Sequence, residues 1–260
     1  MPELPSVEIY KKYFDSTSLE QRIKSVEFKS KEILTENPEL FKKILTDHFF
    51  TSSERYGKYL FTYLDNEQIL VFHFGMTGSL EYGPIIDNPY NRFSLHFQNS
   101  HILAFIDPRK FGRISLTSSM EDFIQEKKLG PDALHINYKF FKELLKKRRG
   151  ALKPLLLNQS FLAGIGNLYA DEILYQSHLH PLTHADKLKP SEIGKMFISM
   201  KKVLKKAIEY MDKPGNLPDS YLLPHRYDGG KCPCGGSINI IRVAGRTTYF
   251  CPKCQKISTS

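Results

Sequence analysis

The first half of the chain carries short apolar or alternating segments separated by turn residues. Helices are predicted over residues 7–14 and 38–47, on either side of the β-leaning run QRIKSVEF. The strands predicted beyond them are YLFTYL, QILVFHF, RFSLHF, HILAFI and RISLT, and the turns are DNE, GSLEYGP, QNS and DPRKFG. Consecutive short strands joined by such turns predict an antiparallel β-sandwich with flanking helices.

The pattern becomes helical after Gly130 and Pro131. Apolar residues then recur at three-to-four spacing in FKELLKKRR, ALKPLLLN, LYADEILYQ and SEIGKMFISMKKVLKKAIEYM. The Pro- and Gly-rich stretch KPGNLPDSYLLPHRYDGG ends the helical part, and the tail after it is expected to form two short hairpins around cysteine pairs. We therefore expect a multidomain α+β chain, with a sandwich over residues 1–131, a helical domain over 132–225 and a hairpin tail over 226–260.

The charge balance favours a polyanionic partner. Lys and Arg outnumber Asp and Glu by 37 to 28, and neutralising a phosphate releases condensed counterions, although a solvated basic surface gives the same totals. The start, MPELPSVEIYKKYF, lacks the pattern of a secretory signal, and no segment reaches transmembrane length. All four cysteines cluster in the tail, which favours metal binding in a reducing compartment over disulfides. A cytoplasmic protein without a membrane partner is expected.

The cysteines form two close pairs, Cys232 with Cys234 and Cys251 with Cys254. Four thiolates from two tight turns can surround one tetrahedral Zn²⁺, with SINIIRVAGRTTYF supplying strands between them. Free or casually paired cysteines are the weaker interpretation. The first pair is C-x-C rather than the usual C-x-x-C, which predicts either a strained site or a differently shaped turn.

Pro2 follows the initiator methionine, and its small size generally permits removal of Met1. The product has a terminal secondary amine, and an α-amino group titrates near ~8 when unperturbed, so a useful fraction is a nucleophile at neutral pH. Glu3 beside it can move protons on a sugar. Taken alone, Pro-Glu is also an ordinary way to open a helix.

Several loops carry residues suited to nucleic acid. FLAGIGNLYADEIL lacks the third small residue of a dinucleotide fingerprint, but its glycine turn and the Asn167 amide suit a DNA phosphate; helix packing is the alternative. Arg246, at a hairpin tip, can fork onto a phosphate or remain a solvated charge. HFGMTG and DPRKFG place Met76, Arg109 and Phe111 at loop tips, as a wedge for the base stack or as core residues.

Three histidines, His178, His180 and His184, cluster in SHLHPLTHAD. A second metal site is one interpretation of them. Surface loop residues are the preferred one, because loop histidines near a proline are usually exposed.

Taken together, these segments resemble the bacterial formamidopyrimidine-DNA glycosylase and endonuclease VIII family. MPELP, RYGKYL, HFGMTGSL, DPRKFG, LGPDAL, GIGNLYADEIL and GRTTYFCPKCQ occur in family order from residue 1 to residue 256. The leucine at the fourth position of MPELP is closer to the formamidopyrimidine branch.

The resemblance implies a two-domain clamp, with a β-sandwich bearing the Pro2 helix and a helix-two-turn-helix domain with a zinc hairpin. DNA is expected in the basic cleft between the domains, bound by a monomer with one structural Zn²⁺. The implied activity is that of a bifunctional base-excision glycosylase and lyase. It removes oxidised bases of the formamidopyrimidine or 8-oxoguanine type and nicks the strand by β- and δ-elimination through a Pro2 Schiff base, with Glu3 as acid/base group.

The resemblance also assigns residues to the DNA. Lys58 matches the family lysine near the scissile phosphates, and three further residues match those that grip the phosphates around the lesion: His73, Asn167 and Arg246. The residues that match those filling the vacated stack are Met76, Arg109 and Phe111, with the arginine facing the orphaned base.

Two departures leave the base preference open. Ser6 stands where the family typically carries a glutamate facing the base pocket, and LPDSYLLPHRYDGGKC lacks the usual lesion-covering loop and the VYGR sequence. A non-catalytic binder of damaged or abasic DNA is the runner-up function. A generic zinc-ribbon module with an unrelated sandwich is the third.

Overall fold

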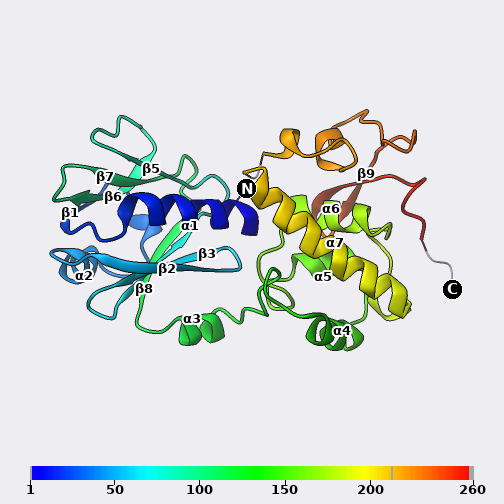
Figure 1. Cartoon of the computed structure of the whole chain (residues 1–260), viewed down its shortest axis with the longest axis horizontal. Coiled ribbons are helices and arrows are strands. Elements are labelled where there is room, and N and C mark those ends of the chain that lie inside the picture. The colour runs from blue at the N-terminus through cyan, green and yellow to red at the C-terminus, as the bar shows by residue number, and fades with distance from the viewer. Residues whose placement is uncertain (1, 212, 258–260) are drawn as a thin grey trace. The chain divides into compact units, whose positions relative to one another are not determined.

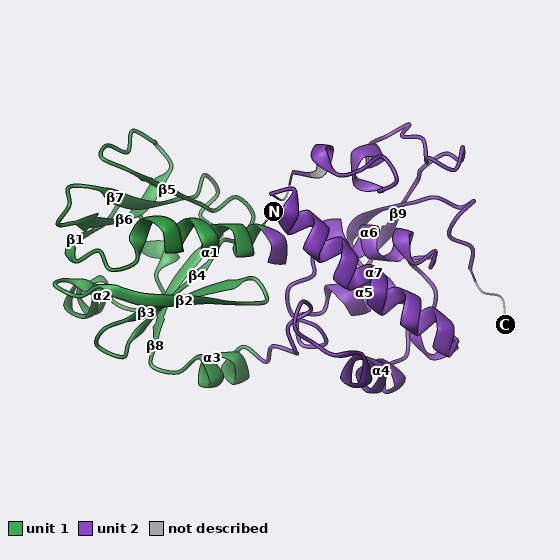
Figure 2. Ribbon diagram, viewed as in Figure 1, with its two compact units in different colours: residues 1–2, 6–127 green, residues 3–5, 128–260 purple. Residues whose placement is uncertain are grey.

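The computed structural model describes residues 2–211 and 213–257. They fall into two compact units, of which the first comprises residues 1–2 and 6–127 and the second residues 3–5 and 128–260 (Figure 2). Their contacts therefore place residues 3–5 in the same unit as the C-terminal half of the chain. Each unit is described by itself.

The described part of the first unit contains two antiparallel four-stranded sheets (Figure 1). One has the order β1-β6-β7-β5, and its strands are Ile23–Phe28, Asn91–Phe97, Ile102–Ile106 and Ser79–Gly83. The other has the order β2-β3-β4-β8, with Phe50–Tyr56, Tyr59–Leu64, Ile69–His73 and Arg113–Thr117. The helices are α1 (Leu4–Ser18), α2 (Pro38–Leu45) and α3 (Met120–Glu126), with a 3₁₀ turn at Lys31–Ile33. The predicted sandwich with flanking helices is confirmed.

Three elements escaped the sequence pattern. GSLEYGP was expected to be a turn, but Ser79–Gly83 within it is edge strand β5, which pairs with β7. β2 is also an edge strand, and its sequence FTSSERY is too polar to predict a strand. The short helix α3 was not predicted either, although Ser119 caps its start by accepting the Asp122 N–H.

Phenylalanine dominates the core of the sandwich. Phe72 lies near its centre, with ring centroids 6.5 Å from Phe14, 6.4 Å from Phe93 and 6.0 Å from Phe105. All four rings are almost completely buried, and burying such a side chain contributes roughly 1.5–3 kcal/mol. The first four residues of β4 are all apolar because a second cluster covers the other face of its sheet. That cluster is formed by Phe61, Ile69, Val71, Met120 and Phe123.

The described part of the second unit is helical and ends in one regular hairpin. Its helices are α4 (Tyr138–Lys146), α5 (Leu152–Leu157), α6 (Asn167–Gln176) and α7 (Pro190–Glu209), followed by β9 (Asn239–Val243) and β10 (Arg246–Phe250). Its 3₁₀ turns are Ala185–Lys187, Pro214–Asn216 and Leu223–His225. The second hairpin expected around the first cysteine pair is reduced to a tight turn closed by a single bridge, Lys231 to Ser237.

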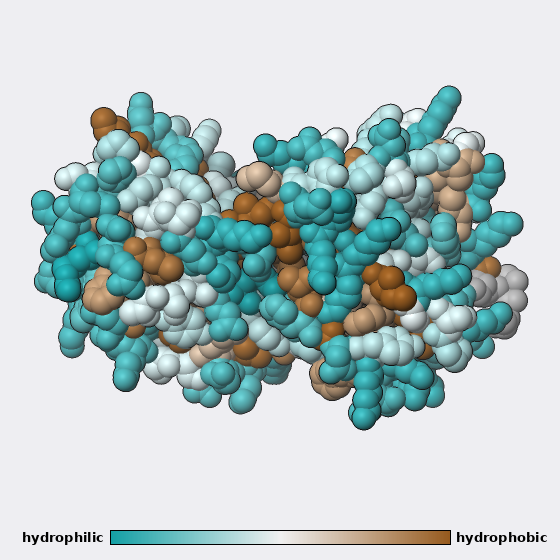
Figure 3. All heavy atoms as spheres, viewed as in Figure 1, coloured by the Kyte–Doolittle hydropathy of each residue, from teal (hydrophilic) through white to brown (hydrophobic). Residues whose placement is uncertain are grey.

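Helix α6 is the centre of this unit. Contacts with α5, α7 and β10 bury seven consecutive residues of α6, including Asp171 and Glu172. The visible surface of the molecule is mostly hydrophilic, with apolar side chains exposed in small groups (Figure 3). Among the described helices, none is long and apolar enough to cross a membrane.

Candidate functional site

Glu3 is anchored at the start of α6. Its side chain is almost completely buried, and its two carboxylate oxygens accept hydrogen bonds from the backbone N–H groups of Gly166 (2.7 Å), Leu168 (2.8 Å) and Tyr169 (3.3 Å). A helix N-terminus favours an anion because its first N–H groups lack helical acceptors. The residue after Pro2 is therefore held by a contact across 163 positions of sequence.

The glycine at position 166 is required by this contact. A Cβ atom there would stand 2.4 Å from Cδ of Glu3, so any side chain would displace the carboxylate. The sequence predicted that this turn offers its backbone N–H groups to a DNA phosphate. That expectation is wrong for the three N–H groups that bind Glu3, because a carboxylate of the protein already occupies them. Pro2 is partly buried, and Met1 lies outside the described residues.

Lys58 lies in the turn between β2 and β3. Buried Arg55 organises this turn, since its Nε donates to Glu8 Oε2 (2.6 Å) and its Nη1 donates to the Gly57 carbonyl (3.2 Å). His73, at the end of β4, pairs in register with Tyr59, and their rings lie 4.9 Å apart. The turn thus brings Lys58 and His73 into one region of the first unit.

His73 is neutral at physiological pH. Burial, reinforced by the positive charges of Lys58 and Arg113, lowers the pKa of its imidazole from 6.5 to about 4. A neutral imidazole can donate one hydrogen bond to a phosphate oxygen without adding charge. Among the predicted phosphate contacts, His73 is therefore a hydrogen-bond donor rather than a cation.

Met76, Arg109 and Phe111 lie on two neighbouring loops of the first unit. The loops approach so closely that a Cβ on Gly75 would stand 2.4 Å from the Phe111 carbonyl carbon, and Gly75 has φ +58°. The Arg109 guanidinium lies 4.7 Å from the centroid of the Phe111 ring, which is 48% exposed, so Phe111 is no core residue. Met76 is partly buried.

Asp107 holds these two loops, a function that the sequence reasoning missed. It is completely buried, and its Oδ1 accepts from the Thr77 hydroxyl (2.5 Å) and the Arg109 N–H (3.3 Å). Its Oδ2 accepts from the Gly112 N–H (2.7 Å). One carboxylate thereby fixes both loops, and the DPRKFG segment was its only sequence signal.

Asn167 and Arg246 come together in the second unit. The Asn167 Nδ2 donates to the Thr247 carbonyl (3.0 Å), so the start of α6 is tied to the hairpin strand that begins with Arg246. Arg246 is exposed. Both predicted phosphate contacts of this unit thus lie in one place.

A buried charge cluster fastens the hairpin to the helices and was not predicted. Asp171 and Lys153 are completely buried, and Lys153 Nζ donates to Asp171 Oδ1 (2.5 Å) and to the Thr248 hydroxyl (2.7 Å). Asp171 Oδ2 accepts from Arg226 Nη2 (2.9 Å) and from the Tyr249 N–H (3.2 Å). Burial raises the pKa of Asp171, while the two cations and the N–H oppose that rise.

Glu172, the next residue, makes a second attachment. It accepts from the N–H groups of Leu222 (3.1 Å) and Leu223 (2.8 Å), in the segment that leads to the cysteines. Burial raises the pKa of Glu172 to about 7. Two neighbouring acids of α6 thus bind the hairpin and the segment that leads to the cysteines.

The four cysteine sulfurs converge as zinc ligands must. All lie within 4.8 Å of one another, with Sγ separations of 3.7 Å for Cys232 and Cys254 and 3.6 Å for Cys234 and Cys251. Thiolates at ~2.3 Å from a tetrahedral zinc stand about 3.8 Å apart, so the donor set fits the ion. The C-x-C pair makes a differently shaped turn, in which the Cys232 N–H donates to Gly236 and the Gly235 N–H to Cys232. A zinc ion bound there would link the two cysteine pairs of the tail to each other.

The clustered histidines have separate environments. His178 and His184 are exposed, whereas His180 is buried with its ring 4.6 Å from that of Phe250, and burial lowers its pKa. Ser6, at the position of the family glutamate, is also buried.

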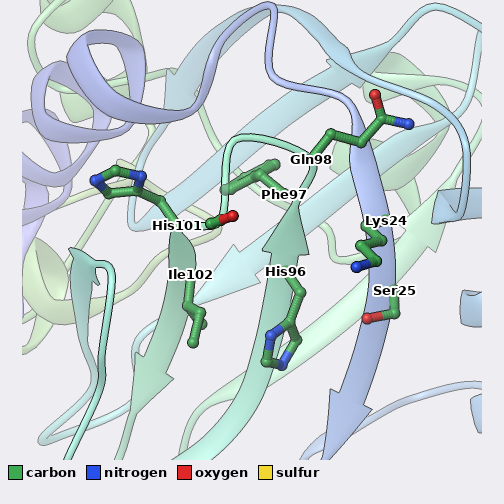
Figure 4. A pocket seen from close by; sticks show the side chains of 8 residues that line it. Lys24, Ser25, His96, Phe97, Gln98, His101 and Ile102 are labelled. Atoms are coloured by element: carbon green, nitrogen blue, oxygen red, sulfur yellow. The ribbon is translucent and has the colours of Figure 1, made fainter.

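A hollow on the sandwich lies between β1, β6 and β7 (Figure 4). Its polar lining includes Lys24, His96 and His101. None of the residues predicted for the functional site lines it.

Comparison with protein families gives three matches in chain order. Residues 1–114 match the formamidopyrimidine-DNA glycosylase N-terminal domain, residues 129–216 match the H2TH domain of the same enzyme, and residues 229–257 match the zinc finger found in FPG and IleRS. With the converging sulfurs, the last match shows that the tail holds one structural zinc ion.

Individual relatives agree over almost the full length. Formamidopyrimidine-DNA glycosylases from Protochlamydia amoebophila and Herpetosiphon aurantiacus are each 35% identical, over 98% of this chain and all of the relative. The structure of Lactococcus lactis Fpg with abasic-site DNA superposes with a TM-score of 0.87 at 31% identity, covering 98% of this chain and 99% of that one. The Lactococcus lactis complex with Fapy-dG DNA gives 0.86 at 32% identity, covering 98% and 100%. The chain therefore belongs to the formamidopyrimidine-DNA glycosylase family.

Proposed function

We propose that this chain excises oxidised bases from double-stranded DNA and then cleaves the strand, using the amine of Pro2 as nucleophile. The observation that supports the proposal most strongly is the binding of the Glu3 carboxylate by backbone N–H groups. A carboxylate directly after the nucleophile is held by three N–H groups at the start of α6. A reacting group needs such fixed surroundings, because misplacement by about 1 Å can cost a factor of roughly one hundred in rate.

The chemistry follows from a secondary amine. With Met1 removed, the lone pair of Pro2 attacks C1′ of the damaged nucleotide, and the base leaves with the electrons of its bond and takes up a proton. Loss of the amine proton and opening of the sugar give an iminium ion. The iminium acidifies the C2′ proton, so its removal expels the 3′ phosphate; a second elimination expels the 5′ phosphate, and water releases the amine. Glu3 is the group assigned to move these protons.

The remaining predicted residues receive DNA-binding roles. Lys58 neutralises the scissile phosphates, and neutral His73 donates a hydrogen bond to a phosphate oxygen. Asn167 and Arg246, linked through Thr247, bind the backbone as one group. The exposed Phe111 ring with Arg109 stacked on it, together with Met76, fills the space of the extruded nucleotide.

The substrate class is proposed from relatives and from one departure. Solved Lactococcus lactis Fpg complexes contain Fapy-dG or abasic-site DNA, and we assign oxidised purines of that type and abasic sites to this chain. Ser6 replaces a bulky acid at the base pocket, which favours tolerance of several bases. We assign the domains to residues 1–131, 132–225 and 226–260, and the protein acts as a cytoplasmic monomer.

The deciding experiment is borohydride trapping on a duplex with one abasic site. The full-length protein, shown by mass spectrometry to lack Met1, is expected to form a covalent adduct that peptide mapping places on Pro2. The matched control is the same chain with Met1 retained, in which the Pro2 nitrogen is an amide and cannot attack.

Two results would overturn the assignment. An adduct on another residue would remove Pro2 from its role. Tight binding of the abasic duplex without any adduct would establish the non-catalytic binder instead.

A further inference from the structure

One side chain outside the cysteine set reaches the zinc ligands. The hydroxyl of Tyr175, on the last turn of α6, lies 3.1 Å from Cys232 Sγ. Both residues are buried, at 6% and 3% exposure, in a small apolar cluster that also contains Leu222, Ile238 and Cys251. The contact therefore takes place away from water, where a hydroxyl needs a partner.

The direction of this hydrogen bond follows from the metal. A zinc-bound cysteine is a thiolate and has no proton to give, so the Tyr175 phenol is the donor and the sulfur the acceptor. A hydrogen bond to an ionised acceptor is roughly twice as strong as one between neutral groups. The phenol thus stabilises negative charge on Cys232.

Cys232 is the first residue of the shortened C-x-C pair. Its backbone N–H donates within its own turn, to the Gly236 carbonyl. The donor to its sulfur comes instead from helix α6 in the helical domain.

We propose that Tyr175 is a positioning residue of the zinc site, which orients the Cys232 thiolate and couples the metal to α6. Phenylalanine would fill the same space in the apolar cluster, so packing alone does not require the hydroxyl. Because α6 begins with Asn167 and carries Asp171, the metal, the phosphate-binding residues and the buried charge cluster share one helix.

The test compares Tyr175→Phe with Tyr249→Phe in the full-length protein. Tyr249 belongs to the same cluster, and no contact of its hydroxyl with a cysteine is found among the described residues. Zinc affinity is measured by chelator competition, and loss of an outer hydrogen bond typically weakens metal binding about 10- to 100-fold. That weakening is expected for Tyr175→Phe and not for Tyr249→Phe.

A spectrum separates positioning from packing. With Co²⁺ in place of zinc, the sulfur-to-cobalt charge-transfer band of Tyr175→Phe is expected at longer wavelength, since the sulfur becomes a better electron donor. The Tyr249→Phe band should stay in place. An unshifted band in Tyr175→Phe, or equal loss of affinity in both variants, would overturn the proposal. Circular dichroism of both zinc-loaded variants verifies that they are folded.

Discussion

The sandwich and the C-terminal tail are each stabilised by a different kind of interaction. In the sandwich, large rings around Phe72 are removed from water and the polar contacts are secondary. The tail has only a small apolar cluster, and its attachment relies on four thiolates, a buried Lys153–Asp171 pair and the N–H groups bound by Glu172. Apolar burial tolerates small shifts, whereas ligation and buried charge depend on direction and distance. The part of the chain bearing Arg246 is therefore the part most sensitive to one lost contact.

Metal removal gives the largest contrast. A structural zinc contributes about 10–16 kcal/mol to folding of small zinc domains, so a chelator should expose the tail to hydrogen exchange over residues 230–255. The sandwich strands should keep their protection, because no cysteine lies in them. Hydrogen-exchange mass spectrometry with and without chelator measures both, and simultaneous loss of protection in the two regions would contradict the comparison.

Asp171→Asn should give the next largest effect. Removing one charge of a buried pair costs about 3–5 kcal/mol, because the remaining charge is left uncompensated. Here Lys153 and Arg226 both lose their anionic partner. Urea unfolding followed by helical circular dichroism measures the change. Asp186→Asn, at an exposed carboxylate of the same unit, is the control and should change stability by less than about 0.5 kcal/mol.

Gly166→Ala probes the fixed direction of Glu3. The added methyl group would overlap the Glu3 carboxylate, and displacement by about 1 Å is expected to lower the rate of the chemical step roughly 100-fold. Gly194→Ala is the control, since the nearest atom to its new Cβ is 3.8 Å away. Single-turnover cleavage of a lesion-containing duplex is the measurement. Equal rates in the two variants would mean that the Glu3 seat does not position the chemistry.

His73 tests whether a half-buried polar group also affects the stability of the sandwich. Its folded pKa of about 4 lies below the 6.5 of the unfolded chain, so the unfolded state binds more protons between these values and stability falls as pH drops from 6.5 to 4. Between pH 7.5 and pH 5, the contribution of His73 to the free energy of unfolding falls by about 2 kcal/mol. In His73→Gln, the free energy of unfolding measured with urea should therefore fall by about 2 kcal/mol less over this pH range. An unchanged pH profile would show that the histidine titrates normally.

Arg246→Ala should have the smallest effect on stability, within about 0.5 kcal/mol, because the side chain is exposed. Its effect should appear in DNA binding, where losing one phosphate contact lowers the salt slope by about one. Arg242→Ala removes an equal charge from the neighbouring strand β9 and is the control. Equal salt slopes of DNA binding for the two variants would show that the net charge of the hairpin matters and that Arg246 makes no specific phosphate contact.

Sequence pattern predicted the sandwich because its central strands are short apolar runs, and it predicted the zinc site because four thiols in one tail have few other uses. Edge strand β2 was missed because FTSSERY is mostly polar. Edge strand β5 was missed because the short run SLEYG lies in a segment whose glycines and proline favour a turn. The buried cluster had no local signal: Lys153, Asp171 and Arg226 are far apart in sequence, and a lysine normally indicates the surface.

The glycine turn shows the same limit within the site. Sequence correctly indicated that Gly166 begins a helix with free N–H groups, but could not show which anion binds them. That anion proved to be Glu3, from the other end of the chain. Asp107 was likewise inside a quoted segment, yet only the fold shows that it joins two loops.

The bond between Glu3 and Gly166 also sets an order of events during synthesis on the ribosome. The first of the N–H groups that bind Glu3 is made 163 residues after Glu3 itself. At about 5–20 residues per second, that interval is roughly ten to thirty seconds. These three N–H groups therefore reach the Glu3 carboxylate only when the start of α6 has emerged.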